Sequence, residues 1–389
     1  MRQNLVFRAS AFAIFLTLCL ISGIAHANDV AVNCPGQSLG AAVAALPPDG
    51  PNTITVTGTC LDENVSIFDM RSLMIVAGAG GAKIVQSQDS DTFDIFRSQF
   101  IRLVNLEIVG IPGSVPGSGG AGVFSQASNM QINGCDIHDN EGGGVTATFA
   151  SVLFLNSTTI RNNTPGGDGL DVLSNSTANV IGSTIKDNGS ACTTLPNCQA
   201  NGEGVFINHS FVVFRGNNLI QNNGDMGINP VDGSSVLLNG PTTIQGHNWN
   251  GISLRSGSHL QINSPAVIRG NGTACPSNTA LLVSLSQACG GISAGENSTV
   301  VLLAGTISGN SGVGISVQQS TNLNLGGGVT VSNNSADGVD IRRISIGNFG
   351  PGNTVTGNGG ASIFCDERSL TIGNLSGFPN VKCGQNAQQ

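Results

Sequence analysis

Three acidic side chains in the middle of the chain have a spacing at which they could do chemistry together. Asp168 and Asp171 lie in the segment GDGLDVL, and Glu203 lies in the similar segment GEGVFIN. Carboxylates within about 5 Å of one another cannot all ionise freely, so one keeps a proton or a cation binds between them. Paired carboxyls of this kind serve general acid–base catalysis. Asp168, Asp171, Glu203 and Arg255 are therefore candidate catalytic residues, and the three carboxylates are also a candidate Ca²⁺ site.

A recurring segment brings these positions together. Residues 251–271, GISLRSGSHLQINSPAVIRGN, contain three short runs in which apolar and polar residues alternate, which predicts three strands separated by turns. Copies of this segment close on Asn140, Asn163, Asn188, Asn223, Asn248, Asn271, Asn310, Asn334 and Asn358. Most intervals are 23 to 25 residues, with two of 35 and 39. Such a period predicts a solenoid of parallel coils, in which Asp168 and Glu203 share one column and Asp171 lies beside them.

The repeat resembles a known family. Its pattern is an opening Gly-apolar-x-apolar, a Ser or Asn turn, and an apolar-x-x-Asn close, over roughly residues 54–383. This pattern is similar to that of the right-handed parallel β-helix family, the pectate-lyase-like superfamily, with no specific enzyme subfamily indicated. The resemblance implies an all-β fold, a right-handed parallel β-helix solenoid of roughly thirteen coils. Because that fold hosts enzymes, adhesins and scaffolds, function must be argued from the site.

The pattern also predicts the domain organisation. Residues 28–389 form a single domain, with an N-terminal cap at 34–50, regular coils at about 121–358 and a disulfide-clipped C-terminal coil at 361–383. Residues 38–46, SLGAAVAAL, are the convincing helical run of the mature chain and precede a Pro-Pro-Asp-Gly stop. We expect a short capping helix there, covering the open end of the first coil.

Residues 1–27 read as a signal peptide. Arg2 and Arg8 precede an apolar run, and Ala25-His26-Ala27 is an A-x-A cleavage site. Cleavage near Ala27 predicts a mature protein that begins near Asn28 and is secreted or periplasmic. No later stretch approaches the roughly 20 apolar residues of a membrane helix, so we expect no membrane insertion.

The charge of the mature chain restricts its partners. Removing residues 1–27 takes two of the 15 basic residues and none of the 23 acidic ones, which leaves 13 against 23, a net charge of −10. An acidic surface argues against nucleic acid as a partner. A polyanionic substrate such as pectate would need Ca²⁺ to bridge the charges. No cofactor is required by the sequence, and the oligomeric state is left open.

Eight cysteines of the mature chain fall into local pairs. The predicted disulfides are Cys34–Cys60, Cys192–Cys198, Cys275–Cys289 and Cys365–Cys383. The outer pairs staple the ends of the solenoid, and the inner pairs clip the two long intervals; export permits such bonds. A metal site is disfavoured because no His lies at ligand spacing. Cys135 is left over, and we expect a buried, inert thiol.

Two functions remain open. The first is an exported protein that binds glycan or another protein along one face without catalysis. The second is a polysaccharide lyase or glycoside hydrolase acting at Asp168, Asp171 and Glu203. Residues 335–338 resemble the polygalacturonase Asn-Thr-Asp-Gly motif, but the paired Asp-Asp, Gly-His-Gly and Arg-Ile-Lys motifs of that family are missing, which favours the first.

Simple structural interpretations compete with both functions. Asp and Gly before strands often only form turns, and this applies also to a second acidic spot formed by Asp337, Asp340, Arg342 and Arg343. Exposed aromatic rings, the usual platforms for sugars, are scarce because the chain has no Tyr and one Trp. Phe124 and Phe206 fall in an outward column, as platforms or as residues covered by neighbouring loops.

Overall fold

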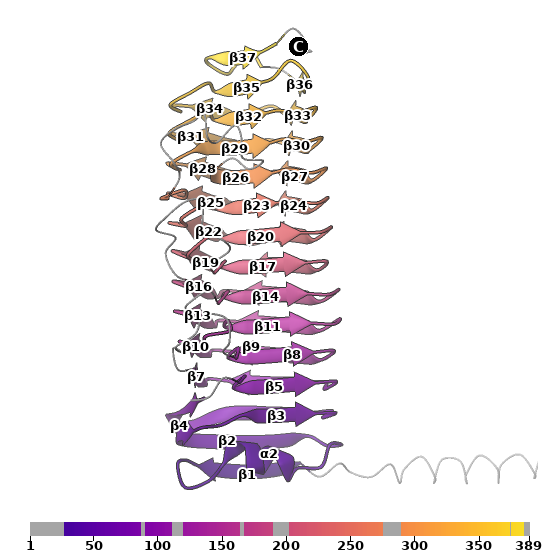
Figure 1. Ribbon diagram of the computed structural model, residues 1–389, viewed down its shortest axis with the longest axis vertical. Helices are drawn as coiled ribbons and strands as arrows, with labels where there is room; N and C mark the ends of the chain where they lie inside the picture. Colours follow the sequence, from indigo (N-terminus) through magenta and orange to yellow (C-terminus); the bar gives the residue numbers. More distant parts are fainter. Residues whose placement is uncertain are drawn as a thin grey trace, which may run out of the picture.

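The chain winds into a column of stacked coils, each built from short strands on three faces (Figure 1). The computed structural model describes residues 27–86, 90–110, 120–163, 167–189, 202–274, 289–373 and 375–384. Strands of successive coils pair in parallel and in register, for example Leu170 with Val205 and Val205 with Ile228. The predicted all-β parallel solenoid is confirmed, and its first face holds thirteen strands. The predicted signal peptide lies almost wholly outside the described residues.

The thirteen-stranded sheet, called the first face from here on, runs the length of the column. Its strands are β3 (Val65–Phe68), β5 (Phe93–Phe96), β8 (Val123–Gln126), β11 (Val145–Thr148), β14 (Leu170–Leu173), β17 (Val205–Asn208), β20 (Ile228–Val231), β23 (Ile252–Leu254), β26 (Gly290–Ala294), β29 (Val313–Val317), β32 (Val339–Ile341), β35 (Ile363–Cys365) and β37 (Val381–Cys383).

A 24-stranded sheet supplies the second and third faces. It begins with β1 (Asn28–Asn33), β2 (Asn52–Leu61) and β4 (Leu73–Val85), the last of which contributes to both faces. The second face continues with β6 (Ile101–Val104), β9 (Asn129–Asn133), β12 (Val152–Asn156), β15 (Thr177–Ile181), β18 (Phe211–Arg215), β21 (Ser235–Leu238), β24 (His259–Ile262), β27 (Thr299–Leu302), β30 (Asn322–Leu325), β33 (Ile346–Phe349) and β36 (Leu370–Gly373). The third face continues with β7 (Glu107–Val109), β10 (Asp136–His138), β13 (Thr159–Arg161), β16 (Thr184–Lys186), β19 (Asn218–Gln221), β22 (Thr242–Gln245), β25 (Ala266–Arg269), β28 (Gly305–Ser308), β31 (Val329–Ser332) and β34 (Thr354–Thr356).

Aliphatic side chains stack in columns inside the coils. On the first face, Leu170, Val205, Ile228 and Ile252 are each fully buried and lie one above the next. The alternation of strand residues explains this, because every second side chain points inward. Burying one such side chain contributes roughly 1.5–3 kcal/mol, and no coil could bury its own face without its neighbours.

Buried asparagines form a hydrogen-bond ladder at the corner between the third and first faces. The Oδ1 atom of Asn163 accepts from both the backbone N–H (3.0 Å) and the side-chain amide (2.9 Å) of Asn140. Asn188 accepts in the same way from Asn163, at 3.2 and 2.8 Å. The ladder continues through Asn223, His247, Asn271, Asn310, Asn334 and Asn358.

The sequence prediction was wrong at one member of this ladder. Asn248 was expected there, but His247 occupies the position and is fully buried. The imidazole Nδ1 accepts from the backbone N–H of Asn223 (3.1 Å), and Nε2 donates to the carbonyl of Ile220 (3.2 Å). The side chain of Asn248 instead donates to the carbonyl of Gly224 (2.8 Å). An imidazole can therefore replace the asparagine amide, and the alignment by Asn shifts by one residue in this coil.

The other two corners carry ladders of small hydroxyl residues. At one corner, Ser128 Oγ accepts from the backbone N–H of Ser98 (2.9 Å), and Ser151 Oγ accepts from that of Ser128 (3.2 Å). At the other corner, Thr158 Oγ1 accepts from the backbone N–H of Cys135 (3.4 Å). Cys135 is free and buried, as predicted, and burial raises the pKa of its thiol to about 11. The thiol is therefore protonated and inert at neutral pH.

The N-terminal end of the solenoid is capped, and a disulfide lies at each end. The helix α2 (Leu39–Ala44) buries Leu39 and Val43 against the first coils, and Glu63 accepts from the N–H groups of Leu39 (2.7 Å) and Gly40 (2.9 Å). This confirms the predicted capping helix. The predicted disulfides Cys34–Cys60 and Cys365–Cys383 are present. The pairs Cys192–Cys198 and Cys275–Cys289 involve residues outside the described ranges.

None of the helical structure in the described ranges has the length and hydropathy needed to cross a bilayer.

Replacing His247 with Asn should remove a pH-dependent cost to folding. Burial lowers the pKa of His247 from 6.5 to about 4. The unfolded chain therefore binds a proton between those values that the folded chain does not, and stability falls as pH decreases through this window. The wild type should lose on the order of 3 kcal/mol more than His247→Asn between about pH 7 and about pH 4. Urea unfolding at both pH values measures this difference. The control is the exposed His209→Asn, and equal pH profiles for His247→Asn and the wild type would contradict the expectation.

Candidate functional site

The predicted carboxylates meet where the first-face strands begin. Leu170 of β14 pairs with Val205 of β17, so Asp168 and Glu203 occupy equivalent positions in adjacent coils. Asp171 points outward from β14, next to Phe206 of β17 in the same column. Glu203 is buried, while Asp168 and Asp171 keep part of their surface accessible. The carboxyl cluster, meaning Asp168, Asp171 and Glu203 from here on, thus has the geometry that the repeat predicts.

Asp168 has a structural contact that other coils repeat. Its Oδ1 atom accepts from the backbone N–H of Glu203 at 2.6 Å. The same contact joins Asp91 to Ala121 N–H (2.5 Å) and Asp337 to Ala361 N–H (2.6 Å). Each of these aspartates is followed three residues later by another, at Asp94, Asp171 and Asp340. The chain therefore carries three Asp-x-x-Asp motifs on one face, and the competing interpretation of Asp168 as a turn residue is correct as far as this one bond goes.

The three carboxyls of the cluster lie close enough to raise one another's pKa. The carboxyl of Asp168 lies within hydrogen-bonding reach of both Asp171 and Glu203. Burial, together with the charges of Asp171 and Glu203, raises the pKa of Asp168 well above its usual range. Burial and the charge of Glu203 raise the pKa of Asp171 to about 6, against hydrogen bonds from Asp168 and Thr146 that lower it. Because each charge disfavours the next, the carboxyls of this cluster bind protons more readily than isolated carboxyls do.

Neighbouring coils add polar groups that the sequence prediction missed. The amide of Asn229 donates to Glu203 Oε1 at 2.9 Å, and Thr146 Oγ1 donates to Asp171 Oδ2 at 3.2 Å. Burial raises the pKa of Asp225 to about 7; the charge of Glu203 adds to this and that of Arg255 opposes it. Glu141, directly after the ladder residue Asn140, is buried one coil before the cluster. The sequence could have indicated Glu141, because its position in the repeat lies beside the column that holds Asp168 and Glu203.

Buried polar atoms without partners are concentrated around this cluster. Ten such side-chain atoms occur in the described ranges, and six of them belong to the coils of β11 to β23. They are Glu141 Oε1, Asp171 Oδ1, Asn229 Oδ1, both amide atoms of Asn250, and Ser253 Oγ. Glu141, Asn229, Asn250 and Ser253 are each at most 4% exposed. Leaving a buried polar atom unpaired costs about 1–3 kcal/mol, so a line of them indicates missing partners. Hydrogen-bond satisfaction depends on rotamers and cannot be read from residue types.

Asn208, which lies on β17 beyond Glu203, and the predicted site residue Arg255 both lie apart from the cluster. Asn208 donates to Asp232 Oδ2 at 2.8 Å, so its amide binds a turn of the next coil and not the carboxyl cluster. Arg255 lies two coils beyond Glu203, and the effect of its charge falls on Asp225. Across the described ranges, no three His, Cys, Asp or Glu side chains are grouped so that they could hold a metal ion. The Ca²⁺ site at Asp168, Asp171 and Glu203 stays a prediction without support from this geometry.

The second acidic spot is internally neutralised. Asp340 Oδ1 accepts from Arg342 Nε at 2.7 Å, and the guanidinium of Arg342 lies 4.6 Å from the ring centroid of Phe364. Asp337 makes the backbone contact that Asp168 also makes. Burial raises the pKa of Asp340 to about 6, and the charge of Arg342 opposes this rise. The second aspartate of the motif thus has an arginine beside it here, whereas Asp171 has the carboxyls of Asp168 and Glu203 beside it.

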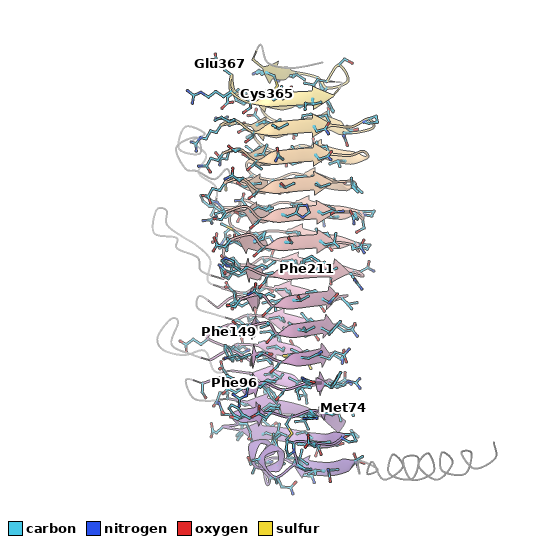
Figure 2. The ribbon with its side chains drawn as sticks, turned by 90° about the vertical axis from the view of Figure 1, so that its right-hand side faces the viewer. Met74, Phe96, Phe149, Phe211, Cys365 and Glu367 are labelled. Atoms are coloured by element: carbon cyan, nitrogen blue, oxygen red, sulfur yellow. A yellow bond between two sulfur atoms is a disulfide. The ribbon has the colours of Figure 1, made fainter. Side chains whose placement is uncertain are left out.

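Aromatic rings line the outer surface near the N-terminal coils. Phe68 and Phe96 stack with centroids 4.9 Å apart and an interplanar angle of 5°, and Phe124 follows Phe96 at 5.8 Å. Phe96 is labelled in Figure 2. Phe124 and Phe206 share the outward column, as predicted, with Thr146 and Asp171 between them. Half-buried rings thus lie in the same column as the Asp171 carboxylate on either side of it.

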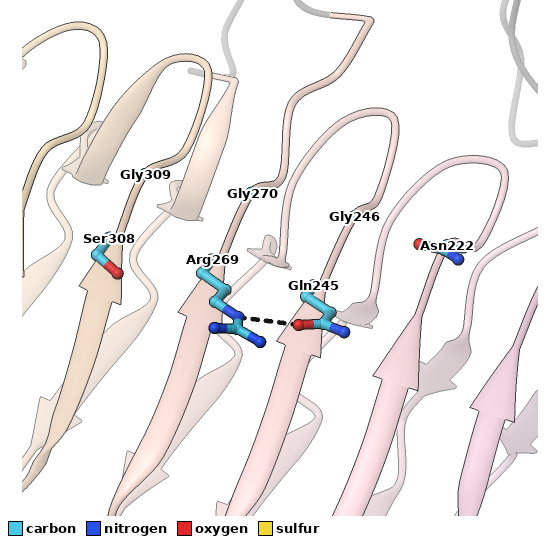
Figure 3. Close-up of a pocket in the computed structure, with 7 residues that line it drawn as sticks. All are labelled: Asn222, Gln245, Gly246, Arg269, Gly270, Ser308 and Gly309. Carbon is cyan, nitrogen blue, oxygen red and sulfur yellow. Dashed lines mark hydrogen bonds between the residues drawn. The ribbon is translucent and has the colours of Figure 1, made fainter.

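An open groove lies at a separate place, where the third-face strands end (Figure 3). Its volume is about 440 Å³, and its lining includes Asn222, Gln245, Arg269 and Ser308. Arg269 Nε donates to Gln245 Oε1 at 2.9 Å. The groove is shallow and contains no carboxylate, and its polar side chains contact one another. We therefore place the candidate site at the carboxyl cluster.

A family model matches part of this chain. The family described as "Right handed beta helix region" matches residues 63–242, so the coils of that stretch are right-handed. A search of curated proteins finds no match. Among solved structures, the Dettilon tailspike protein is 13% identical, with a TM-score of 0.47 over 86% of this chain and 68% of the other. A periplasmic alginate epimerase is 12% identical (TM-score 0.45, 92% and 84%), and the pectate lyase Pel9A is 14% identical (0.40, 94% and 80%).

Replacing Asp171 with Asn should stabilise the protein at neutral pH. The folded-state pKa of Asp171 is raised to about 6, above its ordinary 3.8. Its contribution to stability is therefore complete below about pH 3.8 and is lost as pH rises through about 6. Asp171→Asn should gain on the order of 1–2 kcal/mol at neutral pH, a value discounted for its partial exposure, and nothing near pH 4. Thermal unfolding at the two pH values measures the gain. The exposed Asp62→Asn serves as the control, and a loss of stability at neutral pH would show that the ionised carboxylate has a partner.

Proposed function

We propose that this right-handed parallel β-helix is an exported protein that binds a glycan along its first face, at the carboxyl cluster and the coils that follow it. The observation that carries the proposal is the line of buried, unpaired polar atoms from Glu141 to Ser253. A ligand with many hydroxyl groups supplies donors and acceptors at regular intervals, and such a line requires both. The Asp-x-x-Asp motif at Asp337 and Asp340 binds a backbone N–H and Arg342, and neither aspartate contributes an unpaired atom within the described ranges.

The extent of the line favours an oligomeric ligand over a small molecule. The unpaired atoms lie on four of the five successive coils from that of β11 to that of β23, the coil of β17 having none. At about 4.8 Å per coil, these positions span about 19 Å along the axis. Phe206 lies within the line, directly beside Asp171, and offers an apolar ring face to a sugar. A chain of sugar residues running along the axis would therefore contact several coils at once.

Catalysis on the bound glycan is the second candidate function. It is favoured by the raised pKa of Asp168 beside Asp171, whose pKa is raised to about 6, since neighbouring carboxyls with raised pKa values can exchange protons with a substrate. The two carboxyls lie within hydrogen-bonding reach, however, which is closer than the roughly 5–5.5 Å or 6.5–9.5 Å separations of glycoside hydrolases. The geometry therefore supports binding more directly than hydrolysis, and a proton-abstracting lyase reaction remains the catalytic alternative.

Export is the cellular setting that fits this function. The two disulfides at the ends of the solenoid are typical of proteins that fold outside the cytoplasm. The A-x-A site at residues 25–27 supplies the corresponding leader. Periplasmic or extracellular glycans would then be accessible to the first face.

Replacing Asn250 with Leu should separate binding from folding. Asn250 is fully buried and neither of its amide atoms has a partner, so a similarly sized apolar side chain should raise the melting temperature. The same change should weaken glycan binding about tenfold, the cost of losing one or two good hydrogen bonds. Affinity electrophoresis and calorimetry against a panel of polysaccharides measure the second effect.

The matched control is Asn188→Leu, since Asn188 is an equally buried ladder residue whose amide atoms are all paired. That change should destabilise the fold and should not affect binding directly. A lower melting temperature for Asn250→Leu would mean that its amide already has a partner. No affinity of the wild type for any glycan would overturn the proposal, and release of reducing ends or unsaturated products would establish the catalytic alternative.

A further inference from the structure

The unpaired atoms closest to the carboxyl cluster are all hydrogen-bond acceptors. They are Glu141 Oε1, Asp171 Oδ1 and Asn229 Oδ1. The orientation of Asn229 is fixed because its own N–H donates to Glu203 Oε1, which leaves only its oxygen free. Asn229 and Glu141 are each 4% exposed, so a ligand reaches their oxygens only when the side chains that cover them move aside. A ligand that reaches this end of the line must donate hydrogen bonds.

The same region concentrates negative charge. Five carboxyls lie on the four successive coils of β11, β14, β17 and β20: Glu141, Asp168, Asp171, Glu203 and Asp225. The cluster makes hydrogen bonds to Thr146, to the amide of Asn229 and within itself at the N–H of Glu203. Arg255 is the cation whose charge reaches this region, and it acts on Asp225. The mature chain as a whole has ten more acidic than basic residues, which adds to the negative potential.

Other coils show how this chain normally satisfies an outward aspartate. Three aspartates each accept a hydrogen bond from an arginine. Arg97 donates to Asp69 (2.8 Å), Arg161 to Asp136 (2.9 Å) and Arg342 to Asp340 (2.7 Å). Asp171 occupies the same column as Asp340, but it contacts Thr146 and the carboxyl of Asp168 in place of an arginine, and its Oδ1 atom accepts from no amide, hydroxyl or basic group of the described ranges. Asp94, also in this column, accepts from the Asn64 amide at 3.2 Å. Acidic neighbours on two adjacent coils are the feature that distinguishes the coil of Asp171.

We propose that the glycan bound at this site carries protonated primary amines, as a polymer of hexosamines with free amino groups does, and that its ammonium groups bind at Asp171, Glu141 and Asn229. This inference rests on the proposed function and specifies its ligand. An ammonium group has three N–H donors and no acceptor, which matches a set of acceptors without donors. Hydrogen bonds that join it to a carboxylate are roughly twice as strong as neutral ones. A polyuronate presents carboxylates to the same site and is repelled.

Binding of an ammonium group should also release protons. The carboxyls that face Asp171 are Asp168 and Glu203, with Glu141 and Asp225 on the flanking coils, and Arg255 is the opposing charge. A bound cation favours the ionised form of each carboxyl, so a protein that is partly protonated at Asp171 near pH 6 gives up a proton on binding. Non-specific attraction between a polycation and the acidic surface would not couple to this group.

The experiment compares three oligosaccharides of equal length by isothermal titration calorimetry: a glucosamine oligomer with free amines, its fully N-acetylated form, and a galacturonate oligomer. The free-amine oligomer should bind at least about tenfold more tightly than the acetylated one, the value of a charge-assisted hydrogen bond. The galacturonate oligomer should not bind. Titrations near pH 6 in buffers of different ionisation enthalpy should show proton release.

Asp171→Asn should abolish the preference for free amines and the proton release. Asp340→Asn, the matched control with the same charge change in the same column, should retain both. Equal losses in the two variants would mean diffuse electrostatic attraction and would overturn the inference. Ca²⁺ binding that Asp171→Asn removes would show that the site binds a metal ion, which also overturns it. Binding of the acetylated oligomer with no preference for amines would reject the inference and leave the proposed function standing, whereas no binding of any glycan would reject both.

Discussion

The register between coils, held by buried hydrogen bonds at the three corners, is the constraint on which the rest of this structure depends. At the asparagine corner, most Oδ1 atoms accept two hydrogen bonds from the coil before them, as Asn163 does from Asn140 and Asn310 from Asn271. A slip of one residue would break these bonds and would turn every inward side chain to solvent. Each residue is therefore assigned to a column, and chemistry can be built by placing the right residue in a column.

At most positions the coils satisfy one another's buried polar groups, and the candidate site is an exception. Asp91, Asp168 and Asp337 make the same bond to the next coil, so the first aspartate of each Asp-x-x-Asp motif is part of the scaffold. The second aspartate differs from coil to coil. Asp340 is paired with Arg342, whereas Asp171 faces other carboxyls and keeps an unpaired oxygen. Asp168 has a structural role, because it bonds to the next coil. Asp171 and the unpaired atoms of the following coils have no such role, and we attribute them to a ligand.

Much of the fold followed from the sequence because a solenoid repeats local information. The strand pattern, the columns of Asp168 and Asp171, the terminal disulfides and the buried Cys135 all depend on periodicity, and each agrees with the structure. The error at His247 arose because an imidazole can make the ladder contact, so alignment on Asn alone chose Asn248. The unpaired atoms of Asn229 and Asn250 could not be predicted, since they depend on which neighbour each amide contacts. Asn208 illustrates the same limit, because its amide turns toward Asp232.

The central claim is that the unpaired polar atoms of the first face are the contacts of a bound glycan. A crystal structure of the protein with a glucosamine oligomer tests it most directly. The account predicts a ligand that runs along the solenoid axis, with hydrogen bonds to Asp171 Oδ1, Asn229 Oδ1 and the amide of Asn250. A ligand bound elsewhere, for instance in the groove at Arg269, with Asp171, Asn229 and Asn250 hydrogen-bonded to other groups of the protein, would contradict it.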